Sequence, residues 1–479
     1  MAGGGNDGAQ YGSLAALVFI FNIVVGVGAL SLPHLFLDSG ILLASICLAL
    51  LAFFAYVSAT WIIESQALAN AALLTDQPEA ENRFEIRKRL ELLAMAELFL
   101  GKRGVILVVI AVIVYLFGDL AIYAVAVPKT LLIATSGSIQ IGSLVLADTN
   151  LYRAFVLVFF LVVAPFCFFD FSNTKYLQYV TLTLRQVSFV VMIIVSIMFA
   201  VSSERNKYSP SSDPIPIFRL SGIGSIFGVA IYSFMCHHSI PSLIFPVKNK
   251  NKLMTIFAID YVFIFAMNLV LCISALFAFS GFSNPTCKSN SDLPCRIQDL
   301  YTLNFSSYHI QAISHFLVLY PVFSLTTNFP LLAITLRNNM LFLFKYCLKS
   351  SQEQQAVPAS SWLVRVISSK FGVTLITIVP AILIAASTQD LGLLVSLTGS
   401  IAGLGIQYLI PTALVYFGRQ QMRETPDKQG LLEVPATCLD LSANPLKSPF
   451  QHRAWIWAMI VWSMISFSLA MSYQIKSAT

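Results

Sequence analysis

The sequence predicts an all-α protein that is embedded in a membrane and crosses it eleven times. Hydrophobic residues make up 57% of the 479 residues and charged residues only 11%, whereas a soluble domain carries about 25% charged residues. Apolar runs of about 20 residues, the length that a helix needs to cross a bilayer, recur along almost the whole chain. The expected spans are 14–37, 41–63, 105–130, 152–169, 180–200, 220–246, 255–280, 309–336, 371–387, 391–417 and 454–474.

The basic residues predict how these spans are oriented. Residues 1–13 contain no Lys or Arg, and the first apolar run is too long and too rich in glycine for a cleaved signal peptide. If this short N-terminus is cytoplasmic, 20 of the 29 Lys and Arg residues fall on the cytoplasmic side, as the positive-inside rule requires. The C-terminus is then extracellular or lumenal, in the plasma membrane or in a lysosome or endosome.

The net charge of +6 does not indicate a nucleic-acid partner, because the basic residues lie in the connections between spans. The expected surroundings are membrane lipid, and the sequence identifies no protein partner. One cytoplasmic connection, 77–99, has mixed charges and is typical of an amphipathic helix at the membrane interface.

The first span contains residues that are poorly suited to a continuous helix. Its central stretch, "FNIVVGVGALSLP", carries Asn22, Gly26, Gly28 and Pro33. Unwound backbone survives in hydrocarbon only where protein or a ligand cavity surrounds it. The stretch therefore predicts a broken helix beside a cavity, and the alternative is a kinked helix that packs closely through its small residues.

A second interrupted span occurs where an internal repeat would place it. The sixth span contains "GVAIYSFMCHHSIPSLIFP", which ends in Pro241 and Pro246. Because five is an odd number, a second unit of five spans enters the membrane upside down relative to the first. Paired interrupted spans at matching positions are typical of transporters with a site at mid-membrane. The predicted parts are a first five-helix repeat (14–200), a non-cytoplasmic loop (201–219), an inverted second repeat (220–417), a cytoplasmic loop (418–453) and an eleventh helix (454–474).

The loop between the seventh and eighth spans falls on the non-cytoplasmic side and holds Cys287, Cys295 and the sequon at Asn304. A disulfide between the two cysteines is expected there because that compartment is oxidising, and the alternative is two free thiols. Asn304 is a candidate glycosylation site.

Three stretches resemble signatures of the amino acid/auxin permease family. These are "FNIVVGVGALSLP" in the first span, "YSFMCHHSIPSLIFP" in the sixth and "VSLTGSIAGLGIQYLIPTALVYF" in the tenth. The stretches "YLFGDLAIYAVAVP" and "TNFPLLAITLRNN" are similar to a divergent and poorly characterised branch of that family. The resemblance implies a LeuT-like fold of two inverted five-helix repeats and the transport of amino acids coupled to sodium or protons.

A zwitterionic amino acid needs donors for its carboxylate and acceptors for its ammonium group, and broken helices supply both from the backbone. The predicted substrate-binding residues come from the two breaks and from the third span. They are Val25, Gly26, Val27, Gly28, Ala29, Leu30, Tyr115, Ser233, Phe234, Cys236 and His237.

Sodium is one candidate coupling ion. Asn22 matches by position an asparagine that some sodium-coupled members of the family use as an ion ligand, and its amide oxygen suits a small cation. The second ligand is expected to be a hydroxyl of the eighth span, which offers Ser324, Thr326 and Thr327. The alternative is that these hydroxyls bond back to the carbonyl groups of their own helix.

Protons are the other candidate. Asp119 lies deep in the third span, and an intramembrane carboxylate is a functional candidate by default. The alternative is a structural Asp119, paired with Arg185 or a histidine. His238 is interpreted as a core histidine, and Asp260 as a residue of the cytoplasmic interface.

The sequence gives no support for an enzyme, a metal site or a cofactor. Two histidines and scattered cysteines lack the spacing of a zinc site, and no G-x-x-x-x-G-K-[ST] phosphate loop occurs. The predicted function is secondary active transport of amino acids by alternating access. The alternatives are a membrane receptor that senses an amino acid without transporting it, and a structural membrane protein with a vestigial site.

Overall fold

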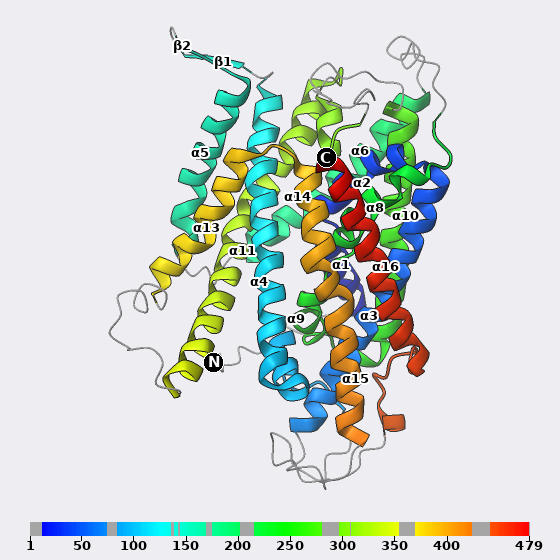
Figure 1. Cartoon of the computed structure of the whole chain (residues 1–479). Coiled ribbons are helices and arrows are strands. Elements are labelled where there is room, and N and C mark those ends of the chain that lie inside the picture. The colour runs from blue at the N-terminus through cyan, green and yellow to red at the C-terminus, as the bar shows by residue number, and fades with distance from the viewer. Residues whose placement is uncertain are drawn as a thin grey trace.

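In the computed structural model of the protein, almost all of the described chain is helical (Figure 1). The structure describes residues 12–73, 84–135, 138–141, 144–168, 175–201, 215–279, 297–306, 308–353, 369–423 and 441–478.

The first half of the chain forms six helices and one small hairpin. They are α1 (Ser13–Val24), α2 (Val27–Ser39), α3 (Ile41–Leu73), α4 (Leu92–Ala134), β1 (Ser138–Ile141), β2 (Leu144–Ala147), α5 (Asp148–Phe168) and α6 (Lys175–Val201). The two strands pair antiparallel, with Ser138 opposite Ala147. The sequence did not predict this hairpin, which is too short and too isolated to give a periodic pattern.

The second half repeats the helical plan with more interruptions. Its longer helices are α8 (Ile223–Ser233), α9 (Ile240–Ile244), α10 (Leu253–Phe279), α11 (Gln311–Glu353), α13 (Lys370–Ser387), α14 (Leu391–Thr398), α15 (Ile410–Arg423) and α16 (Arg453–Ala478). Two π-helical turns, Gly399–Gly403 and Gly405–Leu409, join α14 to α15. Short 3-10 turns include η1 (Leu220–Gly222), η2 (His237–Ser239), η3 (Lys250–Lys252), η4 (Tyr301–Phe305) and η7 (Leu441–Ala443).

Among the described residues, ten helical segments are long and apolar enough to cross a membrane, and the bent pair α1 and α2 makes an eleventh span. The helix axes of α1 and α2 differ by 59° at the break. The prediction of an all-α, eleven-span membrane protein whose first and sixth spans are broken is confirmed.

One local prediction was wrong. In the described part of 77–99, the helix begins only at Leu92, and it continues into the third span through Gly101, whose φ of 65° only a glycine adopts easily. Before it, the side chains of Phe84 and Ile86 are buried, so that segment packs on the bundle. Asp260 lies about two turns from the beginning of α10, and its side chain is buried in the bundle at 2% exposure.

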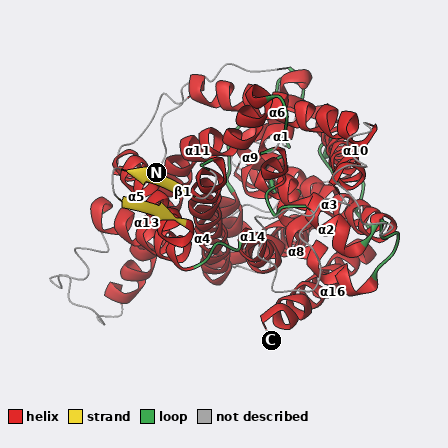
Figure 2. Cartoon of the chain, turned by 90° about the horizontal axis from the view of Figure 1, so that it is seen from above, coloured by secondary structure: helices red, strands yellow, loops and turns green. Residues whose placement is uncertain are grey.

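The helices pack in two groups. In one group, α2 packs on α8, α10 and α3, and α3 also contacts α10. In the other, α4 packs on α11, α5 and α13. Seen from above, α5 and α13 lie at one edge of the bundle and α10 at the opposite edge, with α4 and α14 between them (Figure 2). The two broken spans belong to the first group and face the second.

Candidate functional site at two broken membrane helices

The first break separates α1 from α2. Helix α1 ends at Val24, and Val25 and Gly26 adopt extended backbone conformations before α2 begins at Val27. No side chain caps the first turn of α2. The backbone N–H groups at its N-terminus therefore face the break with a positive dipole end, which favours an anionic group such as a carboxylate.

The second break lies in the sixth span. Helix α8 ends at Ser233, the chain passes through the single turn η2, and α9 starts at Ile240. Phe234 N donates to Ile231 O at 3.3 Å and Met235 N to Tyr232 O at 3.3 Å, so the last turn of α8 tightens before the chain leaves it.

The two breaks touch each other at Gly28. A Cβ atom placed on Gly28 would lie 2.7 Å from both Ser233 Oγ and Tyr232 Cδ1. Only a residue without a side chain allows the start of α2 to approach the end of α8 so closely. The structure thus brings together the two groups of predicted substrate residues, and nearly all of them are buried: Val25, Val27, Gly28, Ala29, Leu30, Tyr115, Ser233, Phe234, Cys236 and His237.

Asp119 faces this contact from α4. Its side chain is 5% exposed, and its carboxylate accepts a hydrogen bond of 2.7 Å from the Tyr232 hydroxyl and another from Tyr115. The Tyr115 ring also packs on the Tyr232 ring at 6.1 Å and on His238 at 5.3 Å between centroids. The sequence analysis singled out Asp119 and Tyr115 but missed Tyr232, which only the tertiary contact identifies.

Arg185 reaches the first break from α6. Its Nη1 donates to the carbonyl oxygens of Asn22 and Val25, and its Nη2 lies 3.4 Å from Ser324 Oγ on α11. The carbonyl groups at the end of a helix carry a partial negative charge, so a guanidinium is well placed there. Arg185 thus bonds to Asn22, Val25 and Ser324 and Asp119 to Tyr232, whereas one interpretation had expected Asp119 to pair with Arg185. An arginine within an apolar span was the sequence signal for this role.

Of the predicted sodium ligands, Ser324 approaches Arg185 through its hydroxyl, and Asn22 accepts from the guanidinium through its backbone carbonyl oxygen. The side-chain oxygen of Asn22 is buried without a hydrogen-bond partner, and Ser324 is 1% exposed. Thr327 donates to Phe323 O and Ser324 O of its own helix. Thr326 is half-buried.

His237 ties the second break to α3. Its Nε2 lies 3.1 Å from Ala55 O and 2.8 Å from Ser58 Oγ. A carbonyl oxygen can only accept, so Nε2 carries the hydrogen and Nδ1 is left without a partner. His237 is fully buried and acts in this state as a structural donor.

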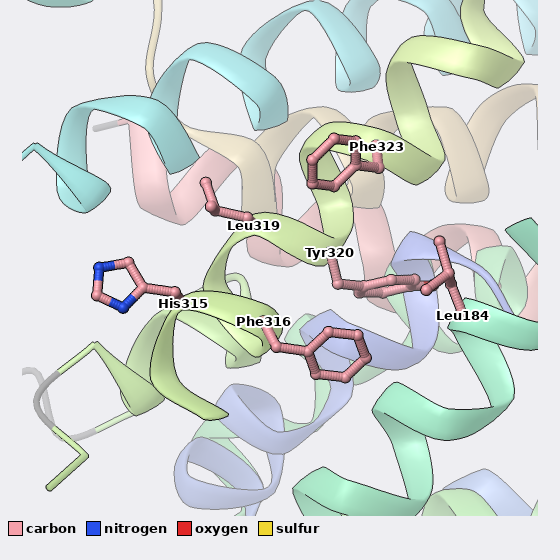
Figure 3. Close-up of a pocket in the computed structure, with 6 residues that line it drawn as sticks. All are labelled: Leu184, His315, Phe316, Leu319, Tyr320 and Phe323. Carbon is pink, nitrogen blue, oxygen red and sulfur yellow. The ribbon is translucent and has the colours of Figure 1, made fainter. Parts of the chain in front are cut away.

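A separate groove of about 320 Å³ lies between α6 and α11 (Figure 3). A ring of mainly apolar side chains lines it: Leu184, His315, Phe316, Leu319, Tyr320 and Phe323. It offers no carboxylate or cationic partner for a zwitterion, so it does not fit an amino acid as well as the breaks do.

The predicted disulfide and glycosylation site lie in the loop before α11. Cys287 and Cys295 are outside the described residues. Asn304 is half-buried, and its Oδ1 accepts from Gln298 N at 3.0 Å. In the part of the chain that the structure describes, no three His, Cys, Asp or Glu residues are grouped as metal ligands.

Comparison with known proteins identifies the family of this chain. The profile of the family described as "Transmembrane amino acid transporter protein" matches residues 10–423. The chain belongs to this family. A solved structure of a LeuT-fold transporter, "Inward facing conformation of Mhp1", is similar in fold, with a TM-score of 0.53 at 14% identity over 98% of this chain and 92% of that one.

Within the transmembrane amino acid transporter family, the chain is similar to the branch that the sequence analysis indicated. It is 35% identical to "Transmembrane protein 104" of Homo sapiens over 98% of each chain. It is equally identical to "Transmembrane protein 104 homolog" of Dictyostelium discoideum, again over 98% of each chain. The predicted family and the LeuT-like fold are confirmed.

Proposed function

We propose that this member of the family is a secondary active transporter that moves an amino acid across the membrane by alternating access, driven by protons. The contact of Gly28 with Ser233 and Tyr232 carries this proposal, because it joins two interrupted helices at one buried point. The free N–H groups of α2 would bind the substrate carboxylate. The carbonyl groups at the end of α8 would accept from its ammonium group.

The proton is favoured over sodium by what surrounds each candidate ligand. Arg185 donates to the Asn22 and Val25 carbonyl groups and approaches Ser324. A sodium ion beside those oxygens would lie next to a guanidinium of the same charge, at a cost that rises in a low-dielectric interior. Asp119 has hydroxyl partners only, Tyr232 and Tyr115. It therefore gains or loses a proton without breaking an ion pair.

The orientation follows from the basic residues. We infer that the end of the bundle where α1 begins is cytoplasmic, and that the end where α2, α4 and α16 finish is extracellular or lumenal. Proteolysis of a tag at either terminus in sealed, right-side-out vesicles tests this: a C-terminal tag should be cleaved and an N-terminal tag protected.

Uptake into proteoliposomes that contain the purified protein tests the function. A panel of labelled amino acids is offered under an imposed sodium gradient or an imposed pH gradient. We expect saturable uptake that the pH gradient drives and the sodium gradient does not. Saturable binding without uptake would instead identify an amino acid sensor, and the absence of both would contradict a functional site.

Asp119→Asn tests the proton carrier. The amide keeps the shape and still accepts from Tyr232 but has no proton to exchange, so concentrative uptake should be lost while exchange of substrate across the membrane remains. Asp390→Asn is the matched control, since Asp390 is an exposed N-cap of α14 and asparagine caps equally well. An unchanged response to the pH gradient in Asp119→Asn would remove this residue from the mechanism.

A further inference from the structure

Charged side chains from three separate segments meet at the outer end of the bundle, where α2 and α4 finish. His34 Nε2 lies 3.9 Å from Asp38 Oδ2 on its own helix and 4.0 Å from Asp299 Oδ1, which precedes η4. Lys129 Nζ of α4 lies 3.1 Å from Asp299 Oδ2 and also donates to Gln389 O at 3.2 Å. None of these side chains belongs to the substrate site.

The geometry fixes which nitrogen of His34 changes its protonation. His34 Nδ1 lies 2.8 Å from the carbonyl oxygen of Ile297. Because a carbonyl oxygen only accepts, Nδ1 must carry a hydrogen in both charge states. Nε2 is therefore the atom that gains or loses the proton, and it is the atom that faces both carboxylates.

The sign of the effect follows from these neighbours. Burial alone would raise the pKa of Asp299, but Lys129 and His34 bring it below its usual range. Asp299 therefore stays ionised between about pH 5 and 8, the interval in which a histidine changes charge. With His34 protonated, two carboxylates face two cations. With His34 neutral, the lone pair of Nε2 points toward two carboxylates and only Lys129 compensates them.

Charges from other neighbouring segments do not reverse this sign. Arg219, on the segment before η1, attracts the Asp38 carboxylate electrostatically and favours its charged form. Tyr473, near the end of α16, lies within electrostatic range of Asp38, Asp299 and Asp390. Neither is a partner that changes its charge in the same pH interval, since an unperturbed tyrosine titrates near pH 10 and arginine stays charged.

The cluster holds down one specific segment. Residues 297–305 lie across the end of α2 and pack on α11, with Ile297, Leu303 and Phe305 each 1% exposed. The other side of the α2 end is joined to the chain before α8 by a backbone hydrogen bond from Arg219 N to Ser39 O at 2.9 Å. That side is fixed by the backbone, whereas the segment 297–305 is held by its buried apolar side chains, by a hydrogen bond between Tyr301 and Ser196, and by the histidine and ion pairs. Of these, only the histidine and its ion pairs respond to pH between about 5 and 8.

We propose that His34, Asp299 and Lys129 form a pH-dependent latch that keeps segment 297–305 closed over the outer end of α2 when the outer compartment is acidic. Loss of the proton from His34 Nε2 removes one of the two cations that hold Asp299 and allows the segment to lift. The latch would control access to the substrate site from the outer side. Only this last step rests on the proposed transport function.

Hydrogen–deuterium exchange tests the latch without any transport assay. The purified full chain in lipid nanodiscs is labelled at about pH 5.5 and about pH 7.5, on either side of the histidine transition, with labelling times scaled for intrinsic exchange. Opening of 297–305 should be about tenfold less frequent at the acidic pH, which corresponds to about 1.4 kcal/mol. Peptides from 441–452, at the opposite end of the bundle, serve as the internal reference.

Three variants decide the assignment. His34→Gln has no proton to gain and Asp299→Asn removes the carboxylate on the segment, so both should abolish the pH difference. His315→Gln is the matched control, because His315 is exposed and its hydrogen bond is to Gln311 O of its own helix. A pH difference that persists in His34→Gln or Asp299→Asn, or that is absent from the wild type, would overturn the latch. If His34→Gln does not fold, Asp299→Asn on the loop still decides.

The exchange result and the uptake result separate the two proposals. A pH difference that depends on His34, in a protein without uptake, retains the latch and removes the transporter. Proton-driven uptake without that pH difference does the reverse.

Discussion

The two broken spans occupy matching positions in the two halves of the chain, yet different groups hold them. At the first break, the carbonyl groups of Asn22 and Val25 accept from Arg185, which belongs to α6. At the second, His237 is itself the donor, and its acceptors Ala55 and Ser58 lie on α3. The first break is therefore held by a side chain from another helix, Arg185. The second is held by a side chain of its own, His237, which bonds to another helix.

This difference distinguishes contacts that can stay fixed during transport from contacts that must change. Helix α3 packs with α2, α8 and α10, so the His237 contact lies inside one group of helices. Arg185 comes from α6, which packs on α10 of the first group as well as on α11, whereas its neighbour Ser324 comes from α11, which packs on α4 in the other group. If the two groups move relative to each other during transport, the contact of Arg185 with Ser324 must change and those of His237 can remain. The following predictions test this distinction.

The largest effect is expected where the two breaks touch. Gly28→Leu places a side chain where even a Cβ would lie 2.7 Å from Ser233 Oγ. Overpacking of this kind costs about 1–3 kcal/mol or more, and we expect saturable binding and uptake to be lost while the protein still inserts. Binding of labelled substrate to purified protein measures this.

Gly405→Ala is the matched control for Gly28→Leu, because Gly405 lies in a π-helical turn outside the two breaks. A Cβ on Gly405 would lie 3.9 Å from the Ala111 Cβ, an ordinary van der Waals contact. Binding should be close to that of the wild type. Normal binding in Gly28→Leu would show that the two breaks do not form one site.

The next largest effect is expected at Arg185. Arg185→Met leaves the carbonyl groups of the first break and the Ser324 hydroxyl without their cation. A hydrogen bond to a charged group contributes about 1.5–3 kcal/mol, so uptake should fall by about tenfold to 100-fold. Sodium in the buffer should restore part of the uptake in Arg185→Met. The uptake of the wild type should not change with sodium.

Arg185→Lys keeps the charge but loses the planar arrangement of donors. Its uptake should lie between that of the wild type and that of Arg185→Met, without a response to sodium. Equal uptake in all three proteins would mean that the guanidinium is only a packing element.

The pattern of Gly and Pro residues allowed both breaks to be predicted from the sequence, because these residues affect the backbone wherever they occur. The same pattern singled out Gly28, which the structure places against Ser233 and Tyr232. What fills each break was not predicted, since Arg185 lies more than 150 residues from the carbonyl groups that it contacts. A long-range pair of this kind has no local pattern.

Asp119 and Asp260 also show that the sequence does not predict tertiary contacts. Both are single carboxylates in apolar spans. The sequence marked Asp119 as a candidate but did not identify its hydroxyl partner Tyr232. It placed Asp260 near the cytoplasmic end but did not show that α10 turns its side chain toward the interior. Distance along a helix predicts depth in the membrane, but only packing decides which face is buried.

A moderate effect is expected at the second break. His237→Ala removes the donor that ties η2 to α3 and leaves a cavity in a fully buried position. The loss of the hydrogen bonds and of packing should lower the stability by about 2–3 kcal/mol. The midpoint of thermal unfolding in detergent should fall, and uptake should fall only in proportion to the folded fraction.

His238→Ala provides the comparison within the same turn. The His238 ring packs on Tyr115, and its Nδ1 has no hydrogen-bond partner. The unfolding midpoint should therefore change less than in His237→Ala. A larger loss of stability in His238→Ala would reverse the roles assigned to the two histidines.

The smallest effect is expected at Ser58, because His237 has a second acceptor. In Ser58→Ala the Nε2 hydrogen still reaches Ala55 O at 3.1 Å, and the serine hydroxyl that is removed was itself donating to carbonyl groups of its own helix. The expected loss is about 0.5–1 kcal/mol, with uptake per folded molecule unchanged. A loss as large as that of His237→Ala would mean that Ser58, and not the Ala55 carbonyl group, holds the second break.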